Sequence, residues 1–325
     1  MKSRIYEFSV WAPYAETVKL HINDLQLPMR KAPDDWFAGE SATTGEDRSP
    51  EGWFCASIES HQTHLDYAFA INGQPPVPDP RSGHQPAGVD HWSRSVNHEE
   101  YPWQDQLWNA PPLSCALIYE LHVGTFTPEG TFEAIIDKLD YLLSIGVTHI
   151  ELMPVAEFHG AYGWGYDGVD IFAPHHPYGG PDGLKKLVNA CHLKGISVII
   201  DVVYNHFGPI GCYAAMFGPY FTEATNTYWG QAINFGGPHS DEVRRFFIDN
   251  AIMWLRDYHC DGLRIDAIQA IVDNSALHFL EQLATEVDEL EASLGRHFVL
   301  IAESDLNDPR VVQSKEIGGF GLDAH

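Results

Sequence analysis

The sequence is poor in positive charge. Its 325 residues include 19 lysines and arginines against 45 aspartates and glutamates, which gives a formal net charge of −26 at pH 7. Nucleic acids and anionic membrane surfaces attract proteins through Lys and Arg, so this balance argues against both as partners. A neutral polymer such as a carbohydrate meets no such repulsion, although acidity also serves solubility alone.

Signals for disulfides, membranes and secretion are scarce as well. The cysteines are odd in number, widely spaced and never arranged as C-x-x-C; they are Cys55, Cys115, Cys191, Cys212 and Cys260. This pattern is typical of a reducing compartment rather than of a disulfide framework or a zinc knuckle. No stretch reaches the roughly 18 apolar residues of a membrane helix, and the first ten residues lack the apolar run of a signal peptide. We therefore expect a soluble, cytoplasmic protein.

Residues 1–100 carry the pattern of β-structure. Apolar residues recur with a period of two within 8–22, as in half-buried strands. A second alternating segment, 66–71, ends at Asn72-Gly73, a dipeptide that favours a tight hairpin turn. A proline-rich segment, 75–112, follows and is interrupted by three tryptophans, which predicts an ordered connection between two domains.

The rest of the chain alternates between buried strands and amphipathic helices. Apolar stripes with helical spacing begin near Phe132, Leu184, Val243 and Leu280, and a glycine is expected to end each of the first two helices. Such alternation implies a parallel sheet, either doubly wound or closed as a (β/α) barrel. The strands are predicted at 116–123, 148–155, 197–203, 262–268 and 298–303.

Three of these strands run into polar clusters at their carboxyl ends. The clusters are Asp201-Val-Val-Tyr-Asn-His206, Arg264-Ile-Asp266 and Glu303-Ser-Asp. In a barrel these ends converge on one mouth, where active sites form. Ion pairs at strand ends, without any function, are the alternative. Three successive strands supply carboxylates to one face, which is more charge than the solubility of the protein requires.

The two later clusters suggest acid–base chemistry. Arg264 and Asp266 lie two residues apart on one strand, so their side chains point to the same side. A neighbouring cation lowers the pKa of a carboxyl and keeps it ionised, as a nucleophile requires. Glu303 would need a raised pKa to act as a proton donor. Two carboxyls with separated pKa values, about 5–5.5 Å apart, serve retaining glycoside hydrolysis.

The three clusters resemble, in residue type, spacing and order, the first three signature regions of the α-amylase superfamily of retaining glycoside hydrolases. The segments 118–126, 153–158, 163–168, 302–309 and 318–324 are similar to the maltooligosyltrehalose trehalohydrolase family. This resemblance implies an α/β fold, a (β/α)8 TIM-type barrel of which about five strands are present. Residues 1–100 would form an N-terminal β-sandwich, a carbohydrate-binding-like module, and residues 101–325 the catalytic barrel.

The resemblance also implies roles for the polar residues. Asp266 corresponds to the nucleophile, Glu303 to the general acid/base and Arg264 to the arginine that orients the nucleophile. The expected substrate-binding residues are Tyr166 beneath the sugar, Asp167 at a sugar hydroxyl, Asp201 as a mainly structural residue, Asn205 supporting the loop, and His206 holding the sugar. No cofactor and no metal site is expected.

The implied reaction is cleavage of the α-1,4 bond next to the trehalose end of maltooligosyltrehalose, with release of trehalose in trehalose biosynthesis. A 1,4-α-glucan branching enzyme with the same intermediate is one alternative, and an inactive glucan-binding fragment is another. A closed barrel needs eight strands, and the third acidic residue of the family has no counterpart before His325. We therefore expect a chain truncated before strands 6–8 that has little hydrolase activity alone. The oligomeric state stays open.

Two further patterns do not support a nucleotide or metal site. Residues 163–168 match G-x-G-x-x-G, but the following segment, 169–174, cannot open the helix that a dinucleotide fingerprint needs. The histidines form no H-E-x-x-H or comparable cluster, so His175 and His176 are expected to be loop residues rather than ligands.

Aromatic residues gather in the long segment between the third strand and the third helix. Tyr220, Trp229 and Phe235 lie there, and they suit a sugar-binding loop or a core cluster about equally. The sequence leaves this choice open.

Overall fold

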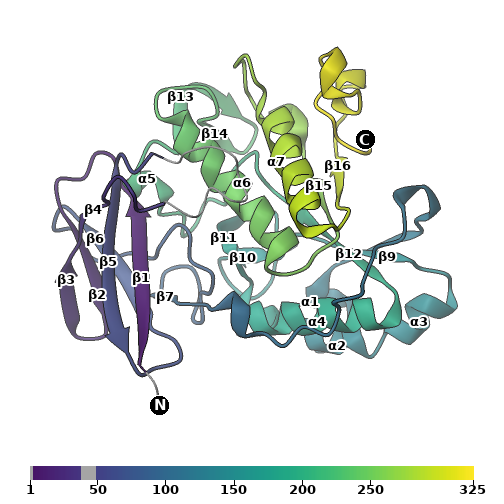
Figure 1. The fold of residues 1–325 in the computed structure, drawn as a ribbon, viewed down its shortest axis with the longest axis horizontal. Helices are drawn as coiled ribbons and strands as arrows, with labels where there is room; N and C mark the ends of the chain where they lie inside the picture. Colours follow the sequence, from purple (N-terminus) through teal and green to yellow (C-terminus); the bar gives the residue numbers. More distant parts are fainter. Residues whose placement is uncertain (1–2, 38–48) are drawn as a thin grey trace.

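The computed structural model describes residues 3–37 and 49–325. Two antiparallel sheets lie at one end of the molecule, and a parallel sheet with its helices lies at the other (Figure 1). Residues 1–2 and 38–48, which belong to the expected N-terminal module, lie outside the described residues.

The antiparallel sheets take up the residues with the alternating pattern. Their strands are β1 (Arg4–Trp11), β2 (Val18–Ile22), β3 (Leu25–Pro28), β4 (Arg30–Lys31), β5 (Trp53–Ser60), β6 (Asp66–Ile71) and β7 (Ser93–Arg94). One sheet has the order β1-β5-β4 and the other β3-β2-β6-β7. The rings of Phe8 and Tyr67 lie 4.7 Å apart, so the sheets pack through their apolar faces. Asn72 and Gly73 have positive φ angles and turn the chain after β6, as predicted.

The parallel sheet contains the five strands that the sequence predicts. They are β8 (Ile118–Leu121), β9 (His149–Leu152), β12 (Ser197–Val202), β15 (Gly262–Ile265) and β16 (Val299–Ala302). Their order in the sheet follows their order along the chain. A doubly wound sheet changes direction at a switch point, so this order favours the barrel-type alternative. Ala324 adds a parallel bridge to Ile301 at the free edge of β16.

Helices and two hairpins fill the connections. The helices are α1 (Val123–Phe126), α2 (Phe132–Ile136), α3 (Leu139–Ser144), α4 (Gly180–Lys194), α5 (Ala214–Phe217), α6 (Ser240–Arg256) and α7 (Phe279–Leu294). The hairpins are β10 (Ala156–Phe158) with β11 (Gly168–Pro174), and β13 (Phe221–Thr227) with β14 (Gly230–Ile233). Within the described ranges, no helix combines the length and the apolar character that crossing a membrane requires.

Most of the predicted helices are confirmed, with one correction. Gly195 ends α4 in the left-handed conformation with φ of 81°, as expected. The single helix expected from Phe132 to Leu143 is instead divided into α2 and α3. The Lys138 N–H bonds to the Ile135 carbonyl, three residues back, and this tighter turn interrupts the α-helical pattern. The strand β11 follows residues 163–168, where no helix was expected.

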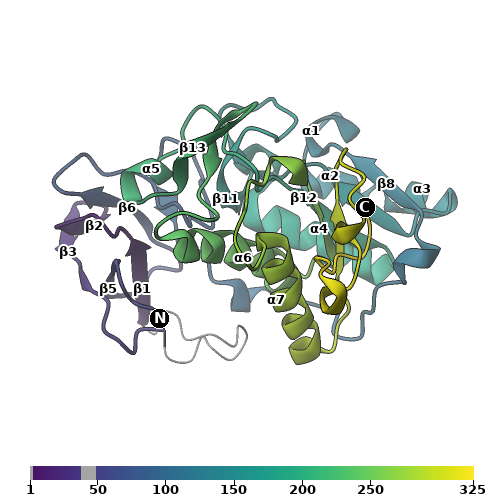
Figure 2. The ribbon, with the colours of Figure 1, turned by 90° about the horizontal axis from the view of Figure 1, so that it is seen from above.

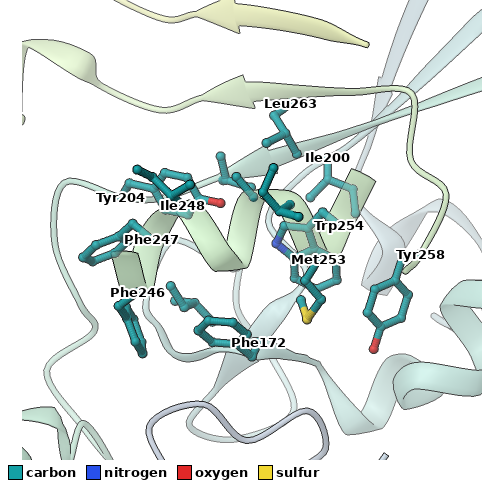
Figure 3. Packing of buried hydrophobic residues seen from close by; sticks show 14 of the residues in the cluster. Phe172, Ile200, Tyr204, Phe246, Phe247, Ile248, Met253, Trp254, Tyr258 and Leu263 are labelled. Carbon is teal, nitrogen blue, oxygen red and sulfur yellow. The ribbon is translucent and has the colours of Figure 1, made fainter. Parts of the chain in front are cut away.

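The core between the sheet and α6 is aromatic. Figure 3 shows Trp254 of α6 beside Ile200 of β12, while Phe246 of α6 lies beside Phe172 of β11, with ring centroids 5.1 Å apart. The buried Phe246, Phe247 and Trp254 come from the apolar stripe that predicts α6. The packing of α6 against Ile200 of β12 and Leu263 of β15 supports two of the strands that carry the polar clusters.

The N-terminal sheets contact the β13–α6 region, as both ribbon views show (Figures 1 and 2). Trp11 of β1 lies edge-on to Tyr220 with ring centroids 5.6 Å apart. Arg81 bonds Asp249 of α6 at 2.7 Å. Tyr220 is therefore a core residue, and so is Phe235, whose ring lies 4.3 Å from that of buried Phe279. Tyr220 and Phe235 are 2% and 1% exposed, so the core alternative holds for these two aromatics and a sugar-binding role does not.

A buried charge network holds the proline-rich connection at the amino-terminal ends of β12 and β15. His192 of α4 contacts Asp105 at 2.7 Å through Nδ1 and Asp261 at 2.9 Å through Nε2, and its side chain is fully buried. Trp108 stacks on His192 and donates Nε1–H to Asp261 at 2.7 Å. Burial alone would lower the pKa of His192, but its hydrogen bonds to both carboxylates raise that pKa. The ordered connection predicted from the sequence is confirmed.

This network predicts a pH-dependent stability. The raised pKa of His192 gives stability that is complete below its ordinary pKa of about 6.5 and lost as pH rises through the folded value. The lowered pKa of Asp261 gives stability that is present above about pH 4 and lost as pH falls. Urea unfolding from pH 4 to 9 should show the largest contribution between these limits. His192→Gln should lose about 3 kcal/mol there.

The matched control is His297→Gln, which removes an exposed histidine bonded to Glu291. It should change the unfolding free energy by less than about 0.5 kcal/mol. If His192→Gln keeps the decline of the native protein at high pH, the network does not control it.

Candidate active site

Strand register brings the predicted polar residues to one edge of the sheet. Asp201 on β12 lies opposite Arg264 on β15, and Arg264 lies opposite Ile301 on β16. Asp266 and Glu303 each follow two residues later, just past the ends of their strands. Because residues two apart on a strand share a face, all four polar side chains meet above the same face.

Arg264 is the centre of this group. Its Nη1 atom donates to Asp201 Oδ2 at 2.7 Å and to Asp266 Oδ1 at 3.0 Å. Its Nη2 atom lies 3.8 Å from Glu303 Oε2. Burial alone would lower the pKa of Arg264, but the Asp201 and Asp266 carboxylates raise it. One permanently charged guanidinium therefore contacts three carboxylates.

Asp201 is the buried member of the group. Its side chain is fully buried, and its Oδ2 atom accepts a second hydrogen bond, from the Tyr166 hydroxyl at 3.0 Å. Among the described residues, its Oδ1 atom has no hydrogen-bond partner. Burial raises the pKa of Asp201 to about 7, against the opposing effect of Arg264. Asp201 thus links the guanidinium to residues 159–167 between β10 and β11, the Tyr166 loop.

A hydrogen bond from the residue after Asp266 links the ends of β15 and β16. Asn205 Nδ2 donates to Asp266 Oδ2 at 3.0 Å, so it holds the carboxylate oxygen that Arg264 does not bond. The next residue, Ala267, is left-handed, with φ of 43°, and its N–H donates to Glu303 Oε2 at 2.6 Å. The side chain of Glu303 is 44% exposed while that of Asp266 is 14% exposed. The more accessible carboxyl is therefore the one suited to exchange protons.

His206 is buried against the Tyr166 loop. Its Nε2 atom lies 3.0 Å from the Tyr166 carbonyl oxygen, and its Nδ1 atom contacts Asn205 Oδ1. Both partners are acceptors, whereas a neutral imidazole has a single N–H. Burial lowers the pKa of His206 and so favours the neutral form. To bond a ligand hydroxyl, His206 must therefore give up one of its protein contacts.

Trp229 covers the His206 ring. The two rings stack with centroids 5.1 Å apart and planes 16° from parallel. Trp229 remains 50% exposed, unlike Tyr220 and Phe235. Of Tyr220, Trp229 and Phe235, Trp229 is the one that stays open to a ligand.

Two glycines let the Tyr166 loop approach its neighbours. At Gly165, with φ of +93°, a Cβ atom would lie 2.1 Å from the Pro154 carbonyl oxygen. At Gly208 a Cβ atom would lie 2.0 Å from the Asp167 carbonyl oxygen. Asp167 itself is exposed, and no hydrogen bond of its side chain is found in residues 3–37 and 49–325. The structure therefore brings together all the predicted site residues except the Asp167 side chain.

Two acidic residues on the same face were missed by the sequence analysis. Glu120 on β8 lies opposite Glu151 on β9, and Glu151 lies opposite Ile199, two residues before Asp201. Burial, then the charge of Glu120, raises the pKa of Glu151. Period-two spacing within each strand could have indicated their face, but their proximity depends on the pairing of different strands.

A group of side chains with the spacing of metal ligands lies outside this cluster. In the described part of the chain, one group of three side chains has the spacing to hold a metal ion: Glu157, His175 and His176. It lies at the start of the segment that leads into α4.

Comparisons with known proteins agree with the motifs. The family described as Alpha amylase, catalytic domain, matches residues 79–218. The malto-oligosyltrehalose trehalohydrolase of Arthrobacter ramosus is 47% identical over 98% of this chain and 53% of its own length. The 1,4-alpha-glucan branching enzyme GlgB of Pseudoalteromonas atlantica is 35% identical over 82% of this chain and 38% of its own length.

A solved structure is similar over most of the chain. A Salmonella typhimurium protein described as an alpha amylase superposes with a TM-score of 0.83 at 38% identity, covering 93% of this chain and 48% of its own. The chain spans about half the length of the curated relatives it matches.

The contact between Tyr166 and Asp201 predicts a measurable titration. Tyr166→Phe removes a hydrogen bond to a buried carboxylate, which is worth about 1.5–3 kcal/mol. The pKa of Asp201, raised to about 7 by burial, should rise further by about one to two pH units. Carboxyl ¹³C NMR with labelled aspartate measures it. Tyr213→Phe, which removes an equivalent bond to Asp90, is the control and should leave the Asp201 signal unchanged. An unchanged titration in Tyr166→Phe would contradict the assigned contact.

Proposed function

We infer, from the premise that the chain belongs to the α-amylase superfamily, that the protein is a retaining glycoside hydrolase. Its proposed substrate is maltooligosyltrehalose, cleaved at the α-1,4 bond next to the trehalose end with release of trehalose. The contact of Arg264 with both Asp266 and Glu303 carries the reaction class. The 47% identity with the trehalohydrolase of Arthrobacter ramosus supports the substrate.

The first chemical step uses both carboxyl groups. Glu303 donates its proton to the glycosidic oxygen, and trehalose leaves with that proton. Asp266 attacks the anomeric carbon and forms the covalent glycosyl-enzyme. Arg264 and Asn205 hydrogen-bond the two oxygens of Asp266, which orients the carboxylate for attack.

The second step reverses the role of Glu303. Its carboxylate takes a proton from water, the water oxygen attacks the anomeric carbon, and the bond to Asp266 breaks. Two inversions give net retention, and Glu303 ends protonated, as it began. The partial exposure of Glu303 supports this role, since water must reach the carboxylate.

The remaining predicted residues are assigned to sugar binding. Tyr166 offers a ring for the apolar face of the sugar while its hydroxyl is held by Asp201. His206 contacts the sugar at the cleaved bond, and Trp229 extends the apolar platform beside it. The exposed Asp167 is free to hydrogen-bond a sugar hydroxyl.

The wider assignments follow the same inference. Residues 1–100, with their two antiparallel sheets, form a β-sandwich and a carbohydrate-binding-like module. Residues 101–325 contribute the parallel strands of the catalytic barrel. The proposed setting is cytoplasmic trehalose biosynthesis.

A branching enzyme is the second candidate, favoured by the 35% identity with GlgB of Pseudoalteromonas atlantica. The same glycosyl-enzyme would form, but a glucan hydroxyl would replace water. Incubation of the full-length protein with maltooligosyltrehalose and with amylose separates the two. Free trehalose from the first supports hydrolysis, and new α-1,6 branches in the second support branching.

Substitutions should separate the roles of the two carboxyl groups in the full-length protein. Asp266→Asn should lower kcat by about 10⁴-fold or more, because no glycosyl-enzyme can form. Glu303→Ala should also be slow with maltooligosyltrehalose, because the leaving trehalose is no longer protonated. With an α-maltosyl fluoride, whose leaving group needs no proton, added azide should restore turnover, because azide needs no proton removed when it attacks the glycosyl-enzyme. The azide product should keep the α configuration. NMR measures the anomeric configuration of the products, and steady-state kinetics measures kcat.

Asp305→Asn is the matched control, since Asp305 is an exposed carboxylate two residues from Glu303. It should retain near-native activity. Near-native turnover of Asp266→Asn would overturn the nucleophile assignment.

A further inference from the structure

A histidine pair lies beside a buried glutamate at the base of the β10–β11 hairpin. Glu157 belongs to β10, and His175 directly follows β11. The His175 N–H bonds to the Val155 carbonyl at 2.7 Å, which brings the end of β11 next to β10. His176 begins the short 3-10 helix His176–Tyr178 that leads into α4. Three separate local structures therefore converge on one point.

The side chains have the spacing of ligands around a single ion. His176 Nδ1 lies 2.8 Å and His175 Nδ1 lies 3.3 Å from Glu157 Oε1. One ligand atom from each of the three residues lies within 4.8 Å of the other two. A tetrahedral ion with bonds of about 2.0–2.1 Å separates its ligand atoms by roughly 3.3 Å. Small adjustments of these side chains therefore suffice to surround an ion.

His175 is the observation that points to a ligand. Its side chain is fully buried, and neither ring nitrogen has a hydrogen-bond partner within residues 3–37 and 49–325. Buried polar side-chain atoms in proteins almost always have a partner. A metal ion at the lone pair of Nδ1 would supply one.

The surrounding charge also suits a cation. Glu157 lies opposite Asp170 in the β10–β11 register, and both side chains are buried. The Oδ2 atom of Asp170 has no hydrogen-bond partner in the described part of the chain. Two neighbouring buried carboxyl groups repel each other when ionised. A divalent cation on Glu157 would offset that repulsion.

We propose that Glu157, His175 and His176 bind a divalent transition metal ion of the zinc class. Two imidazoles and one carboxylate suit zinc, whereas calcium and magnesium prefer oxygen ligands. The side chain of His176 is 30% exposed, so the ion has access from solvent and a water molecule takes the fourth position. The sequence analysis assigned both histidines to a loop and missed this pairing with Glu157.

The location gives the ion a structural role. Residues 159–167 connect β10 to β11 and carry Tyr166 and Asp167. An ion bound by Glu157 and His175 ties together the two strands that bear this loop, and His176 ties them to the start of α4. Metal binding is thus expected to stabilise the loop, whether or not the proposed hydrolysis is correct.

The test is metal binding to the 325-residue chain after removal of metals with a chelator. Titration calorimetry with zinc chloride should give one equivalent bound, and cobalt(II) should give the visible absorption of a four-coordinate ion. Zinc should also raise the Tm. His176→Gln and Glu157→Gln should each weaken zinc binding by about 100-fold or more, since even outer-shell changes cost 10–100-fold.

The matched control is His297→Gln, because His297 forms an exposed pair with Glu291 at 2.7 Å and has the same chemistry. It should bind zinc as tightly as the native chain. Circular dichroism checks that each variant folds, and His176 is only partly buried, so its substitution should be tolerated. Absence of stoichiometric zinc binding, or unchanged binding in folded His176→Gln, overturns the proposal.

Discussion

The candidate active site depends on a single cation. Arg264 contacts Asp201, Asp266 and Glu303, and the first of these is fully buried. Without the guanidinium, three carboxylates would face one another at the end of the sheet, and the positive charge of Arg264 would no longer offset their repulsion. Lysine offers a point charge, whereas the planar guanidinium reaches several acceptors in fixed directions. The register of β12 and β15, the Tyr166 hydroxyl and the Asn205 amide all serve to hold this arrangement.

The five parallel strands and most of the candidate site could be predicted from the sequence, because each depends on a pattern within a short segment. The five strands were visible as short apolar runs, and their carboxyl ends carried Asp201, Arg264 and Glu303. Parallel strands place such ends at the same edge, so the meeting of these side chains followed from fold class. The comparisons with relatives confirm the resemblance drawn from these motifs. The catalytic and binding roles of the individual residues stay predictions.

The features that could not be predicted depend on contacts between elements that are distant in the sequence. Periodicity reports which face of its own strand Glu151 occupies, but not that Glu120 lies opposite it. The sequence pattern of an aromatic residue is the same in a loop and in a core. Only the packing in the structure shows that Tyr220 is buried and that Trp229 is half-exposed. Glu157 is 18 residues before His175 in the sequence. Their proximity required the β10–β11 pairing, which no local pattern specifies.

The register between β12 and β15 determines both the position of Arg264 and the packing of α6, so an error in strand pairing affects both. A shift of β15 by one residue against β12 would turn Arg264 toward the helices and bring Leu263 into the polar cluster. The same shift would bury a guanidinium in the aromatic core of α6. A misaligned chain would therefore lose the polar cluster and part of its stability together. The loss of stability raises the fraction of unfolded chain, which is the fraction that chaperones and proteases act on.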